Sequence, residues 1–273
     1  MESPIAQVIR NAEMNMHSSV DDYEKDGLMY CGKCNTPKQV YIEQFKRAMP
    51  TPCKCRKEEM QKEKELQERI QKQTRIKELR NASLLGERYK DASFENTETS
   101  HSAEFRAVYD RCKRYCEIAE DVLINGIGIY LFGTNGTGKS RLTACMGNEL
   151  MDNGYTVLYT NFTEIARKML KGDEFIKQLA SIEFLFIDDF GTEKVAKGDE
   201  DMWLQEKVFE VINKRYIDRK PIIFTANYSL KELIEDRGMA KRSVDRIMEM
   251  CEMMKLNGDS YRKTVMKQRE RLF

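Results

Sequence analysis

The chain has 273 residues, enough for one large domain or two smaller ones. Charged residues make up 33% of it, the mean hydropathy is −0.65 and the formal net charge is +1, so the sequence predicts a heavily solvated protein whose basic surfaces, if any, are local. The first twenty residues lack the pattern of a signal peptide, and no apolar run approaches the length of a membrane span. We therefore expect a cytoplasmic protein whose eight cysteines are reduced, as ligands or as buried thiols.

Two closely spaced pairs of cysteines lie near the N-terminus. They are the C-x-x-C pair Cys31 and Cys34 and the C-x-C pair Cys53 and Cys55. Zinc prefers four tetrahedral sulfur or nitrogen ligands, and each pair can place two thiolates on one ion. The pattern predicts a zinc module whose folding free energy comes from the metal. Two alternatives stay open, namely that His17 is a substitute ligand or that the four cysteines are incidental.

The segments around these cysteines suggest a division of the chain. Residues 1–25 predict either a mobile arm or a small docking helix. Residues 56–80 are almost entirely Lys, Arg, Glu and Gln, with opposite charges at helical spacing, which favours a solvated helix over a DNA-binding one. The expected parts are a zinc module over 1–55, a charged helical linker over 56–90 and a main domain over 91–273.

The main domain contains the phosphate-binding pattern G-x-x-x-x-G-K-[ST]. Apolar residues 127–132 predict a buried strand before it, and residues 141–151 have the apolar spacing of a helix after it. Glycines let the backbone approach an anion, and the amides of a helix N-terminus donate to it. We expect Lys139 to reach the terminal phosphates and Ser140 to hold Mg²⁺. The expected nucleotide-binding residues are Gly133, Thr134, Asn135, Gly136, Thr137, Gly138, Lys139, Ser140 and Arg141.

A second chemical element lies in residues 182–191, where an apolar strand ends in two acids. Ligands bind at the carboxyl edge of the strands in open α/β sheets. We expect Asp188 to hold Mg²⁺, directly or through water, beside Ser140. Asp189 is expected to orient and deprotonate a water that attacks the terminal phosphate.

Other segments predict the rest of an α/β domain. Helices are expected over 105–124, 164–170 and 201–219, and strands over 156–160 and 221–227. Cys112 and Cys116, one turn apart, are expected to pack in the core. Phe94 either anchors its loop or lines an adenine pocket. Asn227 contacts the terminal phosphate or the attacking water, or else caps the helix that begins near Leu230.

Arginines gather toward the end of the chain. Arg237 is followed by Arg242 and Arg246, which are one helical turn apart and so can project from one face. An ATPase that works as a ring needs an arginine from the neighbouring subunit to neutralise transition-state charge, and can use another in cis. Two ordinary surface arginines are the alternative. The tail, residues 261–271, is basic and predicts contact with a partner or DNA.

Together these motifs resemble the bacterial and phage replicative helicase loaders of the DnaC/DnaI type, within the AAA+ ATPases. The resemblance is carried by the two cysteine pairs, Phe94-Glu95-Asn96, Gly133 to Ser140, Phe186 to Gly191, Thr225-Ala226-Asn227, Arg242 to Arg246 and Gly258 to Arg262. It implies an α/β fold, an AAA+ P-loop NTPase with a parallel sheet flanked by helices, preceded by a small N-terminal zinc-binding domain and a helical linker.

The resemblance also implies roles and cofactors. ATP, Mg²⁺ and Zn²⁺ are the implied cofactors, and the implied activity is hydrolysis of ATP to ADP and phosphate. The implied site residues are Lys139 and Ser140 for phosphates and Mg²⁺, Asp188 as the metal acid, Asp189 as the catalytic acid, Asn227 as a sensor, Arg242 as the trans-acting finger and Arg246 as the second sensor.

The implied function is that of an ATP-dependent loader. Its zinc module would bind a hexameric DnaB-type replicative helicase, its ATPase domain would self-associate into a ring or spiral, and it would deliver the helicase onto single-stranded DNA in the nucleoid. One alternative is an IstB-type AAA+ transposition regulator, which acts on double-stranded DNA and a transposase. Another is a non-hydrolysing helicase adaptor, because Asp189 stands where AAA+ proteins commonly have glutamate.

Overall fold

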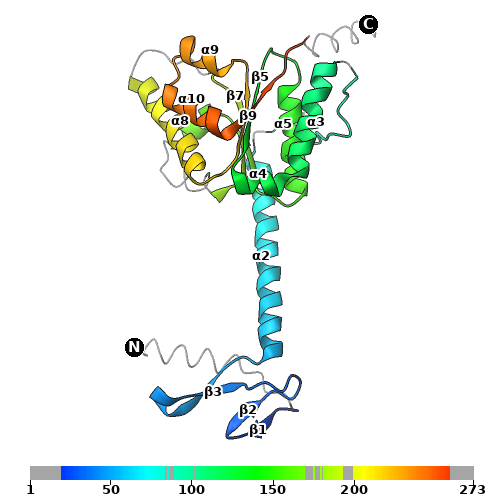
Figure 1. Ribbon diagram of the computed structural model, residues 1–273, viewed down its shortest axis with the longest axis vertical. Coiled ribbons are helices and arrows are strands. Elements are labelled where there is room, and N and C mark those ends of the chain that lie inside the picture. The colour runs from blue at the N-terminus through cyan, green and yellow to red at the C-terminus, as the bar shows by residue number, and fades with distance from the viewer. Residues whose placement is uncertain are drawn as a thin grey trace. The chain divides into compact units, whose positions relative to one another are not determined.

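A computed structural model shows the helices and strands of each part of the chain (Figure 1). It describes residues 20–83, 85, 89–100, 102–169, 175, 179, 181–192 and 199–258. Most of the predicted N-terminal arm, His17, the last residues of the motif that ends at Arg262 and the basic tail lie outside the described residues. Within the described residues, no helix is both long and apolar enough to cross a membrane. The chain divides into two compact units, Met1–Gln71 and Lys72–Phe273.

The first unit contains two small antiparallel hairpins. β1 (Tyr23–Lys25) pairs with β2 (Leu28–Tyr30), and β3 (Gln39–Ile42) pairs with β4 (Arg47–Pro50) across the short 3₁₀ helix η1 (Glu43–Phe45). The first hairpin turns at Asp26 and Gly27, whose φ angles are +52° and +75°. A two-residue turn with both φ angles positive matches the twist of the strands, and Asp-Gly is a favoured sequence for it.

One helix, α2 (Lys54–Ala82), continues from the first unit into the second. Its first half is solvated and carries ion pairs at helical spacing, such as Lys64 with Glu68 at 3.8 Å. Its last turns belong to the second unit, where Ile76 and Leu79 are buried in the core. The helix predicted over 56–80 is therefore confirmed as a helix, but its C-terminal end packs as part of the larger unit.

The second unit is built on a five-stranded parallel sheet with the strand order β6-β7-β8-β5-β9. The strands are β5 (Gly128–Phe132), β6 (Val157–Thr160), β7 (Phe184–Phe190), β8 (Ile222–Ala226) and β9 (Cys251–Lys255). Successive side chains of a strand point to opposite faces. Phe184 and Phe186 accordingly enter one core and Leu185 and Ile187 the other.

Helices cover both faces of this sheet (Figure 1). On one face lie α3 (Ala103–Glu117), α4 (Ala119–Asn125) and α5 (Lys139–Asp152), and on the other lie α6 (Phe162–Met169), α8 (Asp199–Ile217), α9 (Leu230–Glu235) and α10 (Lys241–Met250). This layering, with strands buried on both sides, is the architecture expected of alternating strands and helices.

Two elements of the second unit differ from the sequence predictions. The single helix predicted over 105–124 breaks at Ile118, whose φ and ψ of −104° and 30° are not helical. The break lets Ala119 and Val122 turn into the core, and a glycine in the left-handed conformation, Gly126, ends the second helix. The fifth strand, β9, was not predicted, because its short sequence carries too few apolar positions to mark a buried strand.

Candidate functional site

The phosphate-binding loop joins β5 to α5, as its motif predicts. Gly133 and Gly138 have φ angles of +142° and +102°, values that side chains disfavour. A Cβ atom on Gly133 would lie 2.1 Å from the carbonyl oxygen of Leu256, and one on Gly138 would lie 2.7 Å from Cε2 of Phe105. Both glycines are therefore required by close packing as well as by backbone conformation.

Lys139 lies inside this loop. Its side chain is buried, and its Nζ donates hydrogen bonds of 2.8 Å to the carbonyl oxygens of Gly133 and Thr134. The Thr137 hydroxyl also donates to the Thr134 carbonyl, at 2.9 Å. The ammonium group is held beside the amides of the helix N-terminus, which is the arrangement that attracts an anion.

A cavity of about 640 Å³ opens over the loop. Its volume lies within the range of small-molecule sites. It is lined by Asn135 to Arg141 of the loop and of α5, by Asp189 and Asn227, and by Tyr89, Asn96, Thr97, Glu98 and Phe105. The structure thus brings the predicted phosphate, acid and sensor positions to one hollow.

The first acid lies beside the loop serine. The Ser140 hydroxyl donates to Oδ1 of Asp188 at 3.1 Å, and the Thr225 hydroxyl donates to the same oxygen. Hydroxyl and carboxylate oxygens are the ligands that Mg²⁺ prefers. Ser140 and Asp188 therefore have the chemistry and the spacing to share one Mg²⁺ ion.

Asn227 lines the cavity over the phosphate-binding loop, and its contact with a phosphate or a water stays a prediction. The alternative, that it caps the next helix, is wrong, because Ser229 forms the cap of α9. The Ser229 hydroxyl accepts from the amide of Glu232, whose side chain accepts in turn from the amide of Ser229. Asn227 is half-buried and lines the cavity.

The segment with Asn96 and Thr97 lines part of the cavity, and Phe94 and Arg141 hold it in place. Phe94 is buried and packs edge-on against Tyr109 with ring centroids 5.2 Å apart, so it anchors its loop and does not line the cavity. Arg141 donates from Nε to the Thr97 hydroxyl and from Nη2 to the Asn96 carbonyl oxygen, both at 3.1 Å. The Arg141 side chain thus ties α5 to this segment.

The aromatic lining of the cavity comes from Tyr89 and Phe105, which the sequence reasoning missed as site residues. Phe105 begins the helix predicted over 105–124, where apolar spacing indicates a core position. Its position in the first turn of that helix is the sequence signal for a ligand contact, since a residue there can reach a ligand at the neighbouring loop.

The arginines of the last helix do not line the cavity. The Arg242 and Arg246 guanidinium groups each lie 4.3 Å from the centre of an aromatic ring of α8, Phe209 and Tyr216 respectively. Arg237 instead reaches the loop after the acids. Its Nε donates to the Gly191 carbonyl oxygen at 2.9 Å and its Nη2 to that of Thr192 at 2.5 Å.

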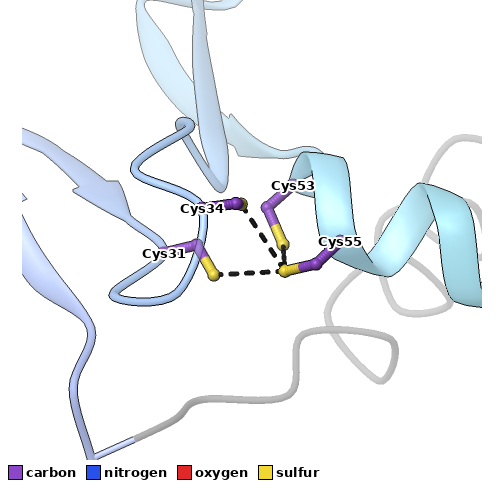
Figure 2. Close-up of side chains that lie close together, drawn as sticks. All are labelled: Cys31, Cys34, Cys53 and Cys55. Carbon is purple, nitrogen blue, oxygen red and sulfur yellow. Dashed lines mark hydrogen bonds between the residues drawn. The ribbon is translucent and has the colours of Figure 1, made fainter.

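The four N-terminal cysteines meet at one point in the first unit (Figure 2). Their Sγ atoms all lie within 4.8 Å of one another. The Sγ atom of Cys55 is 3.5 Å from those of Cys31 and Cys34 and 3.3 Å from that of Cys53. Tetrahedral zinc with bonds of about 2.3 Å separates its sulfur ligands by about 3.8 Å. The spacing and the donor set therefore fit zinc.

The hydrogen bonds of this cluster favour thiolates at its first pair. The Thr36 hydroxyl, 3.0 Å from Sγ of Cys34, is the main cause that lowers the Cys34 pKa to about 5. The backbone amide of Cys34 is the main cause that lowers the Cys31 pKa. The hydrogen bond with Cys53 raises the pKa of Cys55 to about 12. Gathered thiolates repel one another, and a bound cation removes that repulsion.

Comparisons with known proteins identify a family and relatives that this chain resembles. The family described as "IstB-like ATP binding protein" matches residues 38–269. A protein of Sinorhizobium fredii described as a "Putative insertion sequence ATP-binding protein" is 33% identical over 150 residues, 52% of this chain and 48% of that protein. The replicative helicase loader DnaI of Bacillus subtilis is 26% identical over 196 residues, 66% of this chain and 59% of that protein. The alignments thus span about half of the length of these two relatives.

Solved structures agree with the sequence comparisons on the fold. The crystal structure of the DnaC helicase loader is similar with a TM-score of 0.54 at 20% identity, over 63% of this chain and 99% of that one. The fold and the phosphate-binding loop define an AAA+ P-loop ATP-binding domain. The family match extends over most of the chain, which therefore belongs to the IstB-like ATP-binding proteins. The predicted resemblance to loaders of the DnaC/DnaI type is confirmed at this level.

Proposed function

We propose that the chain is an ATP-dependent loader that binds a hexameric DnaB-type replicative helicase and delivers it onto single-stranded DNA at the initiation of replication. Its likeness to DnaI supports this proposal. The observation that carries it is the four-cysteine cluster, which lies in a unit of its own before the ATPase unit. A nucleotide switch can act on a partner only through a part that contacts the partner, and this unit is the candidate.

The proposed chemistry is hydrolysis of ATP. A water oxygen attacks the γ-phosphorus, the bond from that phosphorus to the β,γ-bridging oxygen breaks, and ADP, phosphate and a proton are released. The loop amides and Lys139 hold the phosphates, Asp189 orients the water and accepts its proton, and Asn227 contacts the γ-phosphate. Ser140 and Asp188 hold Mg²⁺, which supplies positive charge to the phosphate oxygens when it is bound.

The proposed division of labour follows the predicted parts. Residues 1–55 bind zinc through the four cysteines and contact the helicase, residues 56–90 connect the parts, and residues 91–273 form the ATPase domain. Bound nucleotide shifts the chain between two conformations that differ in their affinity for helicase and DNA. It can do so only to the extent that it binds one conformation better than the other.

The decisive experiment is a binding assay with the purified replicative helicase of the cell that carries this gene. The tagged chain should retain the purified helicase hexamer in the presence of ATP. Cys31→Ser, which removes a zinc ligand, should lose this binding. Lys33→Ala changes an exposed side chain between the same cysteines and should keep it. Failure of the intact, zinc-loaded chain to bind the helicase at micromolar concentrations would contradict the loader proposal.

Self-association through the ATPase domain is part of the proposal. Arg242 is proposed to act on the neighbouring subunit's nucleotide and Arg246 as a second sensor, which requires both to leave the α8 rings that they contact here. Arg242→Ala subunits mixed with intact ones should lower turnover by more than their share. Turnover proportional to the intact fraction would contradict the trans role.

A transposition regulator is the second candidate, favoured by the higher identity to the insertion-sequence protein than to DnaI, 33% against 26%. It predicts binding to double-stranded DNA and to a transposase, which the same binding assay can include. A non-hydrolysing helicase adaptor is the third candidate, because Asp189 has a shorter reach than glutamate. It predicts helicase binding that depends on ATP, with no release of phosphate.

A further inference from the structure

The two acids occupy an irregular position of the sheet. On either side of them, Ile187 pairs with Phe224 and Phe190 pairs with Ala226. Two residues of β7, Asp188 and Asp189, therefore oppose a single residue of β8, Thr225. This is a β-bulge, a feature that is rare between parallel strands and frequent beside functional sites. The φ angle of Asp189 is +51°, in the left-handed region that non-glycine residues seldom adopt.

The bulge decides where the second acid points. In a regular strand, Asp189 would share a face with Ile187 and would enter the apolar core under α8 and α10. Instead Phe190 shares that core with Ile187, and Asp189 is exposed at the cavity. The extra residue therefore lets two consecutive acids serve one site, which the period of a strand would otherwise prevent.

Thr225 holds this bulge from the neighbouring strand. Its side chain is 2% exposed, and its hydroxyl donates to Oδ1 of Asp188 while it accepts a hydrogen bond of 2.9 Å from the amide of Asp189. A hydroxyl has one proton and two lone pairs, so it can do both at once. The same Asp188 oxygen receives the Ser140 hydroxyl at 3.1 Å.

We propose that Thr225 is a positioning residue that orients both acids at once. Its donated proton fixes the carboxylate of Asp188 toward Ser140, where the two share Mg²⁺. Its accepted hydrogen bond keeps the Asp189 amide in the bulge and so directs the Asp189 carboxylate into the cavity. The effect on turnover rests on the proposed ATP hydrolysis, whereas the effect on Mg²⁺-dependent nucleotide affinity does not.

The test compares three variants of the full-length chain. Thr225→Val removes the hydroxyl and keeps the shape, and Thr225→Ser keeps the hydroxyl. Thr160→Val is the matched control, because Thr160 is also buried at the end of a parallel strand. Among the described residues, its hydroxyl donates only to the carbonyl oxygen of Asn161, at 3.4 Å. Each variant is measured for thermal unfolding, for ATP affinity with and without Mg²⁺, and for phosphate release as a function of Mg²⁺ concentration.

Thr225→Val should raise the Mg²⁺ concentration at half-saturation, or lower kcat, by about 10- to 100-fold, as removal of an outer partner of a metal ligand typically does. Its ATP affinity without Mg²⁺ should stay that of the intact chain. Thr225→Ser and Thr160→Val should keep the intact chain's Mg²⁺ dependence. If Thr225→Val unfolds at a much lower temperature, Thr225→Ala replaces it as the variant without the hydroxyl.

Two outcomes would overturn the inference. One is a Thr225→Val variant whose Mg²⁺ concentration at half-saturation and whose kcat are both those of the intact chain. The other is equal impairment of Thr225→Ser and Thr225→Val, since the shape of the side chain and not its hydroxyl would then matter. Failure of the proposed hydrolysis gives a different result, because the intact chain itself would then release no phosphate. The Mg²⁺ dependence of its ATP affinity would still show whether Thr225 orients Asp188.

Discussion

Residues 20–71 and residues 72–258 differ in what lies at their centres. Among the described residues of the first unit, only Cys31, Lys38 and Cys53 are buried, and Nζ of Lys38 pairs with Asp22 at 2.5 Å. The second unit buries two apolar clusters, one on each face of its sheet. A chain segment this short cannot bury enough apolar surface to offset its conformational entropy. We therefore propose that folding of the first unit depends on metal binding by its cysteines, whereas folding of the second does not.

The same contrast appears in the side chains exposed on the two units. In the β3–β4 hairpin, Val40, Tyr41 and Phe45 are each about half exposed, at 48%, 55% and 51%. In the five strands of the second unit, the apolar residues are all buried except Phe132 and Met253, which are half-buried. The smaller unit thus exposes these apolar side chains on its surface, as protein–protein contact surfaces often do.

The largest expected effect comes from breaking the cysteine cluster. Cys31→Ser should release zinc and unfold the hairpins of the first unit, because a structural zinc ion contributes on the order of 10 kcal/mol to folding. The second unit should keep its nucleotide affinity. Metal analysis, together with amide exchange of residues 20–55, measures the outcome, with Lys33→Ala as control. Protected hairpin amides in a chain free of zinc would show that the unit folds without metal.

The converse change is made in the second unit. Lys139→Ala removes the ammonium that lies within the phosphate loop, and turnover should fall by about 10²- to 10³-fold because a preorganised charge at the transferred phosphate is lost. Zinc content and the hairpins should be unaffected. Phosphate release and calorimetric titration of ATP measure it. Lys231→Ala, at an exposed lysine of α9, serves as control, and equal turnover of both variants would sink the site assignment.

How far the sequence predicts this molecule depends on how local each feature is. The phosphate loop between a strand and a helix, the acids at a strand end and the paired cysteines are all set by neighbours in sequence. The fold class and the positions of Lys139, Ser140 and Asp188 relative to one another follow from them. Such motifs need no knowledge of distant contacts, because the chemistry fixes their spacing.

The features that sequence reasoning missed depend on distant contacts. The bulge at Asp189 is a change in the register of β7 against β8, so it depends on a strand that is distant in sequence. The side-chain amide of Asn148, on α5, donates to the carbonyl oxygens of Tyr89, Lys90 and Ala92 and so holds Tyr89 at the cavity. Periodicity along one segment carries no information on either contact.

Arg215, in the second unit, is the clearest example of a residue whose role depends on contacts that are distant in sequence. It is 1% exposed, and its guanidinium donates to the carbonyl oxygens of Leu179, Ile182, Glu183 and Pro221 at 2.6–3.0 Å. Burial lowers its pKa to about 9, so it is still charged at neutral pH. Its guanidinium thereby supplies hydrogen-bond donors to carbonyl groups of the segment before β7 and of the segment before β8.

Arg215→Met should lower the free energy of unfolding of the second unit by about 3 kcal/mol, because several buried carbonyl groups lose their donor. Urea unfolding measured on the intact chain gives the value. The exposed Arg114, whose Arg114→Met change should cost less than about 0.5 kcal/mol, is the control. A shift no larger than that of the control would mean that water replaces the guanidinium at these carbonyls.

The smallest expected effect sharpens the contrast between the cysteines of the two units. Cys112 is fully buried on α3, and burial raises the pKa of its thiol to about 12, so it is a neutral packing group. Cys112→Ala should cost about 1 kcal/mol of stability, as loss of one buried atom does, and should leave the zinc content unchanged. Urea unfolding and metal analysis check both results. Loss of zinc from Cys112→Ala would contradict the separation of ligand cysteines in the first unit from packing cysteines in the second.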